Sequence, residues 1–231
     1  MTRTSVLPES ANKSRAVEEM FDRIAPRYDA LNRALTFRMD VGWRNAAVAS
    51  LDLKPGSRVL DLACGTGDLC RTLAAAGHEP VGVDFSAGML GARHTDAPVV
   101  RADALRLPFP TAAFAGVTCG FALRNFVDVD AVFGECARVL CPGGRFAALD
   151  AAVPTNPILR AGNAVWFRGA VPLLGRLVAH DTEAYRYLPK STAYLPPLLE
   201  LATRLERAGF REVRHTTLTG GSVLLLTGTR R

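Results

Sequence analysis

The sequence predicts an α/β fold in which a mostly parallel β-sheet is covered by helices on both faces. Between residues 57 and 150, short aliphatic and β-branched runs alternate with helical patterns, which is typical of a parallel sheet. The first of these runs leads into a glycine turn, "ACGTGD", and then into a helix start. Two β-rich runs, "REVRHTTLT" and "SVLLLTGT", close the chain around Gly220 and Gly221, and we expect them to form an antiparallel hairpin.

The segment before the sheet is expected to be helical. Residues 1–13 are polar and predict a flexible N-terminus, after which Ser14 is suited to cap a helix. The apolar face of that helix has helical spacing and consists of Val17, Met20, Phe21 and Ile24. Pro26 bends or ends the helix, "RYDALN" follows as a loop or a new turn, and a second helix is expected from about 40 to 52.

Five strands and three helices are expected next. In chain order, the strands are "SRVLDLA", "EPVGVDF", "VVRAD", "AGVTCG" and "RFAALD". The helices are "GDLCRTLAAAG", a short one in "SAGMLGAR", and one from roughly 129 to 140 that ends in the turn "CPGG". We therefore expect residues 14–231 to form a single domain, with N-terminal helices over 14–52.

The regular alternation stops between residues 153 and 190, which are rich in proline, arginine and aromatic residues. We interpret this stretch as a helical lid insertion, followed by a helix at about 191–208. Residues 158–178 are apolar with basic interruptions, and their large apolar side chains are Trp166, Phe167, Leu173, Leu174 and Leu177. Contact with an anionic membrane surface and packing on the protein core both remain open for this stretch.

Composition excludes several classes of protein. The net charge is +6 without a run of five or six like charges, which disfavours nucleic acid as a partner. The five cysteines form no CxxC pair and have no histidine at zinc spacing, so we expect reduced thiols, no metal site and a cytoplasmic protein. The N-terminus lacks the apolar core of a signal peptide, and the longest apolar region, 161–179, is interrupted by Arg168, Pro172 and Arg176.

The glycine turn predicts a binding site for a cationic ligand. Gly65 and Gly67 allow a tight turn and close approach of a ligand to the backbone. Cys70 occupies the third glycine position of the dinucleotide fingerprint, and Asp61 and Asp68 flank the turn. These acids would repel a pyrophosphate and attract the sulfonium and ammonium groups of S-adenosylmethionine.

Two more acids end the second and third strands. Asp84 is placed to accept hydrogen bonds from both hydroxyls of a ribose, although NAD-binding proteins share this feature. Asp103 is placed to accept from an adenine amine, with the amide of Ala104 facing the ring. Each acid alone is equally well explained as a cap of the following helix. The glycine turn and both acids together favour a ligand crevice at the carboxyl ends of the strands.

These motifs resemble the UbiE/MenG family of C-methyltransferases in ubiquinone and menaquinone biosynthesis, over nearly the whole chain. The glycine loop "VLDLACGTGDL" is general to class I methyltransferases. The segments "RIAPRYD", "LRNF" and "AYRYLP" are much more specific to this family.

The resemblance implies a class I methyltransferase fold, a Rossmann-like three-layer sandwich whose seven-stranded, mostly parallel sheet ends in an antiparallel hairpin. It also implies S-adenosylmethionine as the cofactor and a prenylated quinol as the substrate, most specifically the conversion of demethylmenaquinol to menaquinol. The cofactor-binding positions it implies are Asp61, Gly65, Thr66, Gly67, Asp84, Phe85, Asp103, Ala104 and Gly120.

The sequence departs from the family pattern at several positions. The segment between Asp84 and Val99 is short, and Gly120 replaces a serine that many members place near the cofactor. "DAA" at 150–152 stands where a Glu-Phe-Ser type sequence is usual, and Ala179 and Leu226 replace a common serine and histidine. These departures affect the expected substrate more than the expected cofactor.

Arg124 and Asn125 follow the fourth strand and are the leading catalytic candidates. Methylation of a phenolic ring carbon is favoured when the ring hydroxyl ionises, and these side chains can donate to that oxygen, directly or through a water. The competing interpretation is that Arg124 pairs with Asp128 or another nearby carboxylate and fixes the loop. Tyr28 is expected to contact the substrate or cofactor, or to pack on the sheet, and Asp150 is expected to orient Arg124 or act as a base.

Other interpretations remain open at this level. The chain is expected to methylate a quinol, with another small aromatic or polyketide-like metabolite as the alternative acceptor. A non-catalytic relative that binds the cofactor is a third interpretation. A dimer and a peripheral contact with the inner face of the membrane are compatible with the sequence. His180 is interpreted as a surface residue, and Tyr185 and Tyr187 as residues of the lid.

Overall fold

Seven strands form one sheet in the order β3-β2-β1-β4-β5-β7-β6 in the computed structural model, which describes residues 10–165, 191 and 195–231. Strands β1 to β5 are parallel to one another, and β7 lies antiparallel between β5 and β6. The strands are β1 Arg58–Leu62, β2 Glu79–Asp84, β3 Val99–Arg101, β4 Phe114–Gly120, β5 Leu140–Ala151, β6 Phe210–Leu218 and β7 Val223–Arg230. The predicted seven-stranded sheet with an antiparallel C-terminal hairpin is confirmed.

Helices precede the sheet and connect its strands. The α-helices are α1 Ser10–Ile24, α2 Tyr28–Leu35, α3 Met39–Ser50, α4 Asp68–Ala75, α5 Ala87–Gly91, α6 Val129–Val139, α7 Pro157–Val165 and α10 Leu198–Arg207. Short 3-10 turns are η1 Ala25–Arg27, η2 Leu123–Asn125 and η5 Thr219–Gly221.

Side chains of β5 alternate between two cores, one on each face of the sheet. Phe146 and Ala148 belong to the core that includes α6 and α10, whereas Ala147 and Leu149 belong to the core that includes α3 and α4. All four are almost completely buried. A strand buried on both faces requires a helix layer on each side, which gives the three-layer arrangement.

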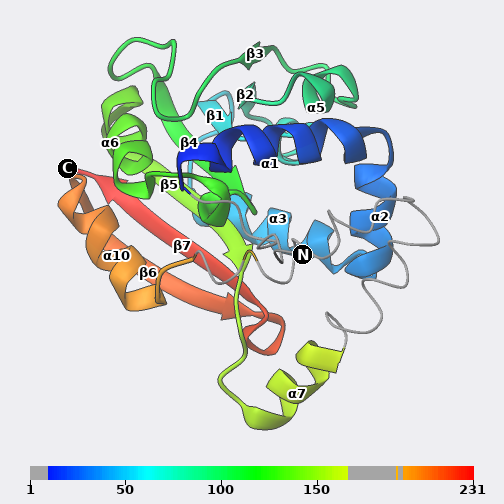
Figure 1. Ribbon diagram of the computed structural model, residues 1–231. Coiled ribbons are helices and arrows are strands. Elements are labelled where there is room, and N and C mark those ends of the chain that lie inside the picture. The colour runs from blue at the N-terminus through cyan, green and yellow to red at the C-terminus, as the bar shows by residue number, and fades with distance from the viewer. Residues whose placement is uncertain (1–9, 166–190, 192–194) are drawn as a thin grey trace.

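Helix α1 crosses the sheet at the end where β1, β2 and β4 finish. Figure 1 shows it (dark blue) running in front of the central strands, and it contacts both α5 and the turn η2 that follows β4. The loops that follow parallel strands lie at the same edge of the sheet, which is where a ligand crevice is expected. Helix α1 therefore lies beside the expected crevice.

Three predicted boundaries differ from the structure. Helix α1 begins at Ser10, not at Ser14, and Lys13 of the expected flexible tail is buried. Of the two expectations for "RYDALN", the loop is wrong and the new turn is nearer, because helix α2 starts at Tyr28 directly after η1 and continues to Leu35. Helix α10 begins at Leu198, seven residues after the predicted start, since the residue preceding a proline is disfavoured in helical conformation and Pro196 and Pro197 stand here.

The predicted turn "CPGG" lies within β5 as a strand irregularity. Leu140 pairs with Phe114, whereas the next pair along the two strands joins Arg145 to Gly116. The extra residues on β5 form a bulge, at which Gly143 has a φ of +77°.

Part of the predicted lid lies outside the described residues. Helix α7 is the portion that the structure describes, and Trp166, Phe167, Leu173, Leu174, Leu177, Ala179, His180, Tyr185 and Tyr187 fall outside it, as do residues 1–9. Within the described ranges, no helix combines the length and apolar character needed to cross a bilayer.

Candidate active site

The glycine turn between β1 and α4 adopts backbone conformations that favour glycine. Gly65 and Gly67 have φ values of +56° and +89°. A Cβ atom on Gly67 would lie 2.4 Å from Cγ2 of Thr95, so both the conformation and the close approach exclude a larger residue. The sequence-based interpretation of this turn as a tight loop agrees with this geometry.

Asp61 is a buried carboxyl group beneath that turn. Its side chain accepts a hydrogen bond of 3.0 Å from Oγ1 of Thr118 and one of 3.4 Å from Sγ of Cys70. Burial raises the pKa of Asp61 to about 7, although these hydrogen bonds act to lower it. A cation bound nearby would restore the charged form, so this site favours a positively charged ligand group.

Asp84 links the end of β2 to the glycine turn. Its two carboxylate oxygens accept from the backbone N–H of Gly65 at 2.7 Å and of Ser86 at 2.8 Å. Burial raises its pKa, and the hydrogen bonds from Ser86 and Gly65 oppose that shift. Each carboxylate oxygen has a second lone pair, so Asp84 can still accept from ligand hydroxyls.

Two adjoining cavities lie at this edge of the sheet, with volumes of about 130 and 230 Å³. Both are bordered by Tyr28, Gly65 and Gly120. The first also includes further predicted cofactor positions, namely Asp84, Phe85, Asp103 and Ala104. The second includes Asp61 and Thr66. The structure therefore places eight of the nine predicted cofactor residues around these adjoining cavities, whereas Gly67 borders neither of them.

The predicted catalytic pair is divided between the two cavities. Asn125 borders the first cavity, and Arg124 borders the second. Tyr28 contributes to both, and its ring packs edge-on against Phe21 with centroids 6.0 Å apart. Burial raises the pKa of Tyr28, while a hydrogen bond with Asn32 and the Arg124 charge act in the opposite direction, so its hydroxyl is a donor at neutral pH.

Arg124 is buried and forms an ion pair with Asp150. Nη1 of Arg124 contacts the carboxylate, and the backbone N–H of Arg124 donates to the other carboxylate oxygen at 3.1 Å. Nη1 also donates to the carbonyl of Phe121 at 2.8 Å, and Nε donates to Oγ of Ser191 at 3.0 Å. The two side chains are 7% and 0% exposed, so the pair is removed from solvent.

The expectation that Arg124 pairs with Asp128 or another nearby carboxylate is met by the second alternative, because the partner is Asp150 and not Asp128. Asp128 instead caps α6, where its carboxylate accepts from the N–H of Ala131 at 3.0 Å. Asp150, at the end of β5, borders neither cavity and is fully buried. This placement suits a carboxylate that orients Arg124 rather than one that removes a proton from a substrate.

Thr66 and Gly120 have structural contacts that the sequence did not indicate. Oγ1 of Thr66 donates to the Asp29 carboxylate, which ties the glycine turn to α2. A Cβ atom on Gly120 would lie 2.8 Å from Cδ1 of Leu69, so glycine allows β4 to pack closely against α4.

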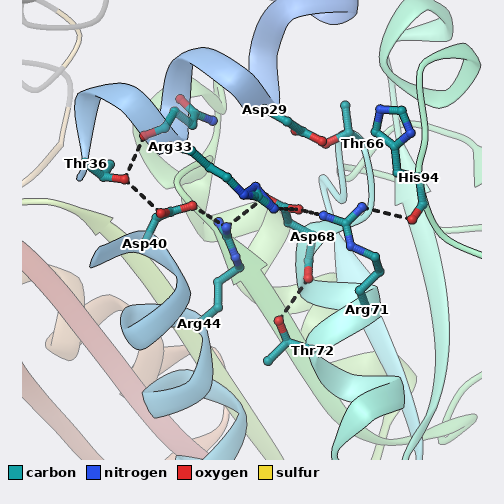
Figure 2. A network of polar contacts seen from close by, with 11 residues as sticks. Asp29, Arg33, Thr36, Asp40, Arg44, Thr66, Asp68, Arg71, Thr72 and His94 are labelled. Carbon is teal, nitrogen blue, oxygen red and sulfur yellow. Dashed lines mark hydrogen bonds and ion pairs between the residues drawn. The ribbon is translucent and has the colours of Figure 1, made fainter. Parts of the chain in front are cut away.

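The acid Asp68 is compensated by three arginines, which sequence reasoning missed. Figure 2 shows the side chains of Arg33, Arg44 and Arg71 converging on its carboxylate. The first two distances are 3.2 and 2.8 Å, and Arg44 also pairs with Asp40. Asp68 therefore adds little net negative charge to the glycine turn, contrary to the sequence argument. Arg71 lies three residues after Asp68 on α4, a spacing that the sequence shows, whereas Arg33 and Arg44 come from α2 and α3 and no local sequence pattern links them to Asp68.

Solved structures place this fold among class I methyltransferases. An S-adenosylmethionine-dependent methyltransferase from Thermotoga maritima has a TM-score of 0.64 at 18% identity, covering 93% of this chain and 99% of its own. Phosphoethanolamine N-methyltransferase 2 of Haemonchus contortus, solved with S-adenosyl-L-methionine, has a TM-score of 0.60 at 15% identity, covering 82% of this chain and 52% of its own. At these identities the likeness concerns the fold.

Sequence relatives define the family. The ubiE/COQ5 methyltransferase family model matches residues 9–230. A demethylmenaquinone methyltransferase of Roseiflexus sp. (strain RS-1) is 40% identical over 235 residues and covers 99% of each chain. A protein of the same name from Thermus thermophilus is 43% identical over 220 residues, covering 91% of this chain and 100% of its own.

The chain belongs to the ubiE/COQ5 methyltransferase family. It is thus a methyltransferase that uses S-adenosylmethionine. The resemblance deduced from "RIAPRYD", "LRNF" and "AYRYLP" is confirmed.

Proposed function

We propose that this protein methylates a ring carbon of a prenylated quinol, converting demethylmenaquinol to menaquinol. The observation that carries the proposal is the second cavity, which adjoins the predicted cofactor residues and has Arg124 and Tyr28 at its border. Relatives named demethylmenaquinone methyltransferase match nearly the whole chain, which supports the same acceptor.

The first cavity fits the adenosine portion of S-adenosylmethionine. Ribose hydroxyls and the adenine amine are hydrogen-bond donors, and the carboxylates of Asp84 and Asp103 are acceptors that border this cavity. Ala104 is nearly buried beside them and provides an apolar contact for the ring. Asp61 and the turn at Gly65–Gly67 then fit the cationic methionine end, in keeping with the donor chemistry described above.

The cofactor supplies an electrophilic methyl group, so the protein needs to align the acceptor and stabilise its anionic form. We infer that Nη2 of Arg124 faces the second cavity, since Nε and Nη1 are engaged by Ser191, Phe121 and Asp150. The guanidinium stabilises the ring oxygen as its proton leaves to water, and Tyr28 provides a second donor. The ring carbon gains the methyl group as the bond between that methyl group and sulfur breaks, which leaves S-adenosylhomocysteine. The ring then loses its carbon-bound proton to solvent and the ring oxygen regains a proton, which restores the aromatic quinol.

Asp150 acts indirectly in this mechanism. Its buried carboxylate holds Arg124 through both the side chain and the backbone N–H. A guanidinium held at two points loses less conformational freedom when the acceptor binds. Asp150 is therefore a positioning residue, and the proton acceptor is solvent.

The acceptor assignment is tested with labelled S-adenosylmethionine and a panel of quinols and phenols, followed by product analysis by mass. We expect methyl transfer to the ring carbon of a demethylmenaquinol with a short prenyl chain. Turnover of another phenol without turnover of any quinol would favour the alternative of a different small aromatic acceptor. Cofactor binding without transfer to any compound would favour a non-catalytic relative.

We further propose that the protein works in the cytoplasm in peripheral contact with the membrane. A prenylated acceptor partitions into the bilayer, and helix α7 exposes Ile158 and Leu159, which are 81% and 48% accessible. Co-sedimentation with vesicles of phosphatidylglycerol and phosphatidylcholine measures this contact. Binding that Ile158→Ser weakens supports the proposal, and equal recovery of both proteins in the supernatant contradicts it.

A further inference from the structure

A buried lysine from the N-terminal helix reaches the loop that carries the catalytic candidates. Lys13 of α1 is 6% exposed. Its Nζ donates to the carbonyl oxygen of Arg124 at 2.9 Å and to that of Phe126 at 2.8 Å. Burial of an ammonium group is unfavourable and lowers the pKa of Lys13. The two hydrogen bonds to carbonyl oxygens offset this cost.

The two carbonyl groups lie on either side of Asn125 and Phe126 in the backbone. The loop contains η2, and inside it the N–H of Asn125 donates to the carbonyl of Ala122 at 2.8 Å. Backbone carbonyls in such a loop need donors, and here a single side chain provides two. Lys13 thereby fixes the peptide plane before Asn125 and the one after Phe126, and both of these residues border the first cavity.

Helix α1 is anchored at its other end beside the same cavity. Glu18 pairs with Arg101 at 2.9 Å, and Asp22 accepts from the N–H of Gly88 at 2.8 Å and from the hydroxyl of Ser86. Ser86 and Gly88 lie at the start of α5, two and four positions after Asp84 of β2.

Between these anchor points, α1 forms a wall of the first cavity. Val17 and Phe21 contribute to that wall. The helix therefore connects the cofactor cavity to the Arg124–Asn125 loop, with Lys13 at the loop end.

We propose that Lys13 is a positioning residue for methyl transfer, which holds the Arg124–Asn125 loop in alignment with the cofactor cavity through two backbone carbonyls. The role in transfer rests on the function proposed above, whereas the effect on the loop is independent of it. Lys13 touches neither reacting group and acts through the backbone of the loop.

The kinetic test compares Lys13→Met with Arg15→Met on the same helix. Arg15 is a matched control, because its side chain is 85% exposed and pairs with Glu19 on the surface. We expect Lys13→Met to lower kcat by about 100-fold, the size of effect known for small misplacements of catalytic groups, with the KM for S-adenosylmethionine changed far less. Arg15→Met should match the unmodified protein. Equal loss in both variants, or none in Lys13→Met, would overturn the proposal.

A double variant separates positioning from general destabilisation. If Lys13 acts through the loop, Lys13→Met combined with Asn125→Ala should lose little more activity than the more impaired single variant. Losses that multiply would show that Lys13 and Asn125 act independently, and the proposal would fail.

Hydrogen–deuterium exchange of residues 122–127 provides a readout that needs no methyl acceptor. We expect faster exchange of this segment in Lys13→Met than in Arg15→Met, while β1 and β4 exchange equally in both. Unchanged exchange of the loop would refute the proposed contact even if the protein methylates a quinol. Faster loop exchange in a protein that methylates no quinol would retain the contact and reject only the proposed function.

Discussion

The ion pair between Arg124 and Asp150 makes a quantitative prediction about stability. Substitution Asp150→Ala leaves the Arg124 guanidinium buried without its carboxylate and removes the acceptor for the backbone N–H groups of Arg124 and Ala151. Breaking a buried pair by removing one partner costs about 3–5 kcal/mol. We expect the free energy of unfolding to fall by this amount, as measured by urea denaturation monitored by circular dichroism.

A control in the same loop sharpens the prediction. Asp128→Ala removes only an exposed helix cap and should cost about 1 kcal/mol. The double substitution Arg124→Met with Asp150→Leu should be more stable than Asp150→Ala, because no uncompensated charge stays buried. If Asp150→Ala costs no more than Asp128→Ala, Asp150 does not hold Arg124 and its assigned positioning role is wrong.

Two further predictions concern the glycine turn. The pKa of Asp61 is raised from its ordinary value of 3.8 to about 7, so this group favours folding fully below pH 4 and loses that contribution as the pH rises through 7. A pKa shift of this size corresponds to about 4 kcal/mol of folding free energy at most. Asp61→Asn should therefore flatten the loss of stability between pH 4 and 8 in urea denaturation measured over that pH range. The same substitution should weaken S-adenosylmethionine binding in calorimetry. An unchanged pH profile would contradict the raised pKa. Gly67→Ala forces a side chain into a φ of +89° and against Thr95, and should lower stability by about 1–3 kcal/mol in thermal melts; a neutral result would mean that the turn relaxes freely.

The sheet could be predicted because its signals are local. Alternating strand and helix patterns predicted each of β1 to β7. The carboxyl ends of parallel strands bring Asp84 and Asp103 to the same cavity even though they lie 19 positions apart in the sequence. Helix α10 begins at Leu198 and not near residue 191, because Pro196 and Pro197 disfavour helical conformation in the residues before them.

The partners of the site residues could not be predicted, because they depend on packing between distant segments. Asp128 is closer to Arg124 in sequence, but the chain brings Asp150 to it from the neighbouring strand β5. The polar sequence around Lys13 predicts a flexible tail, since nothing in it indicates that a loop more than 100 residues away offers two carbonyls.

The most direct test of the account is the transfer of a labelled methyl group from S-adenosylmethionine to a demethylmenaquinol with a short prenyl chain. The unmodified protein should give one product that carries the methyl group on a ring carbon, and Arg124→Ala should retain cofactor binding in calorimetry while losing transfer. Transfer to a ring oxygen, or to another phenol in place of every quinol, would contradict the assignment of the second cavity as a quinol site.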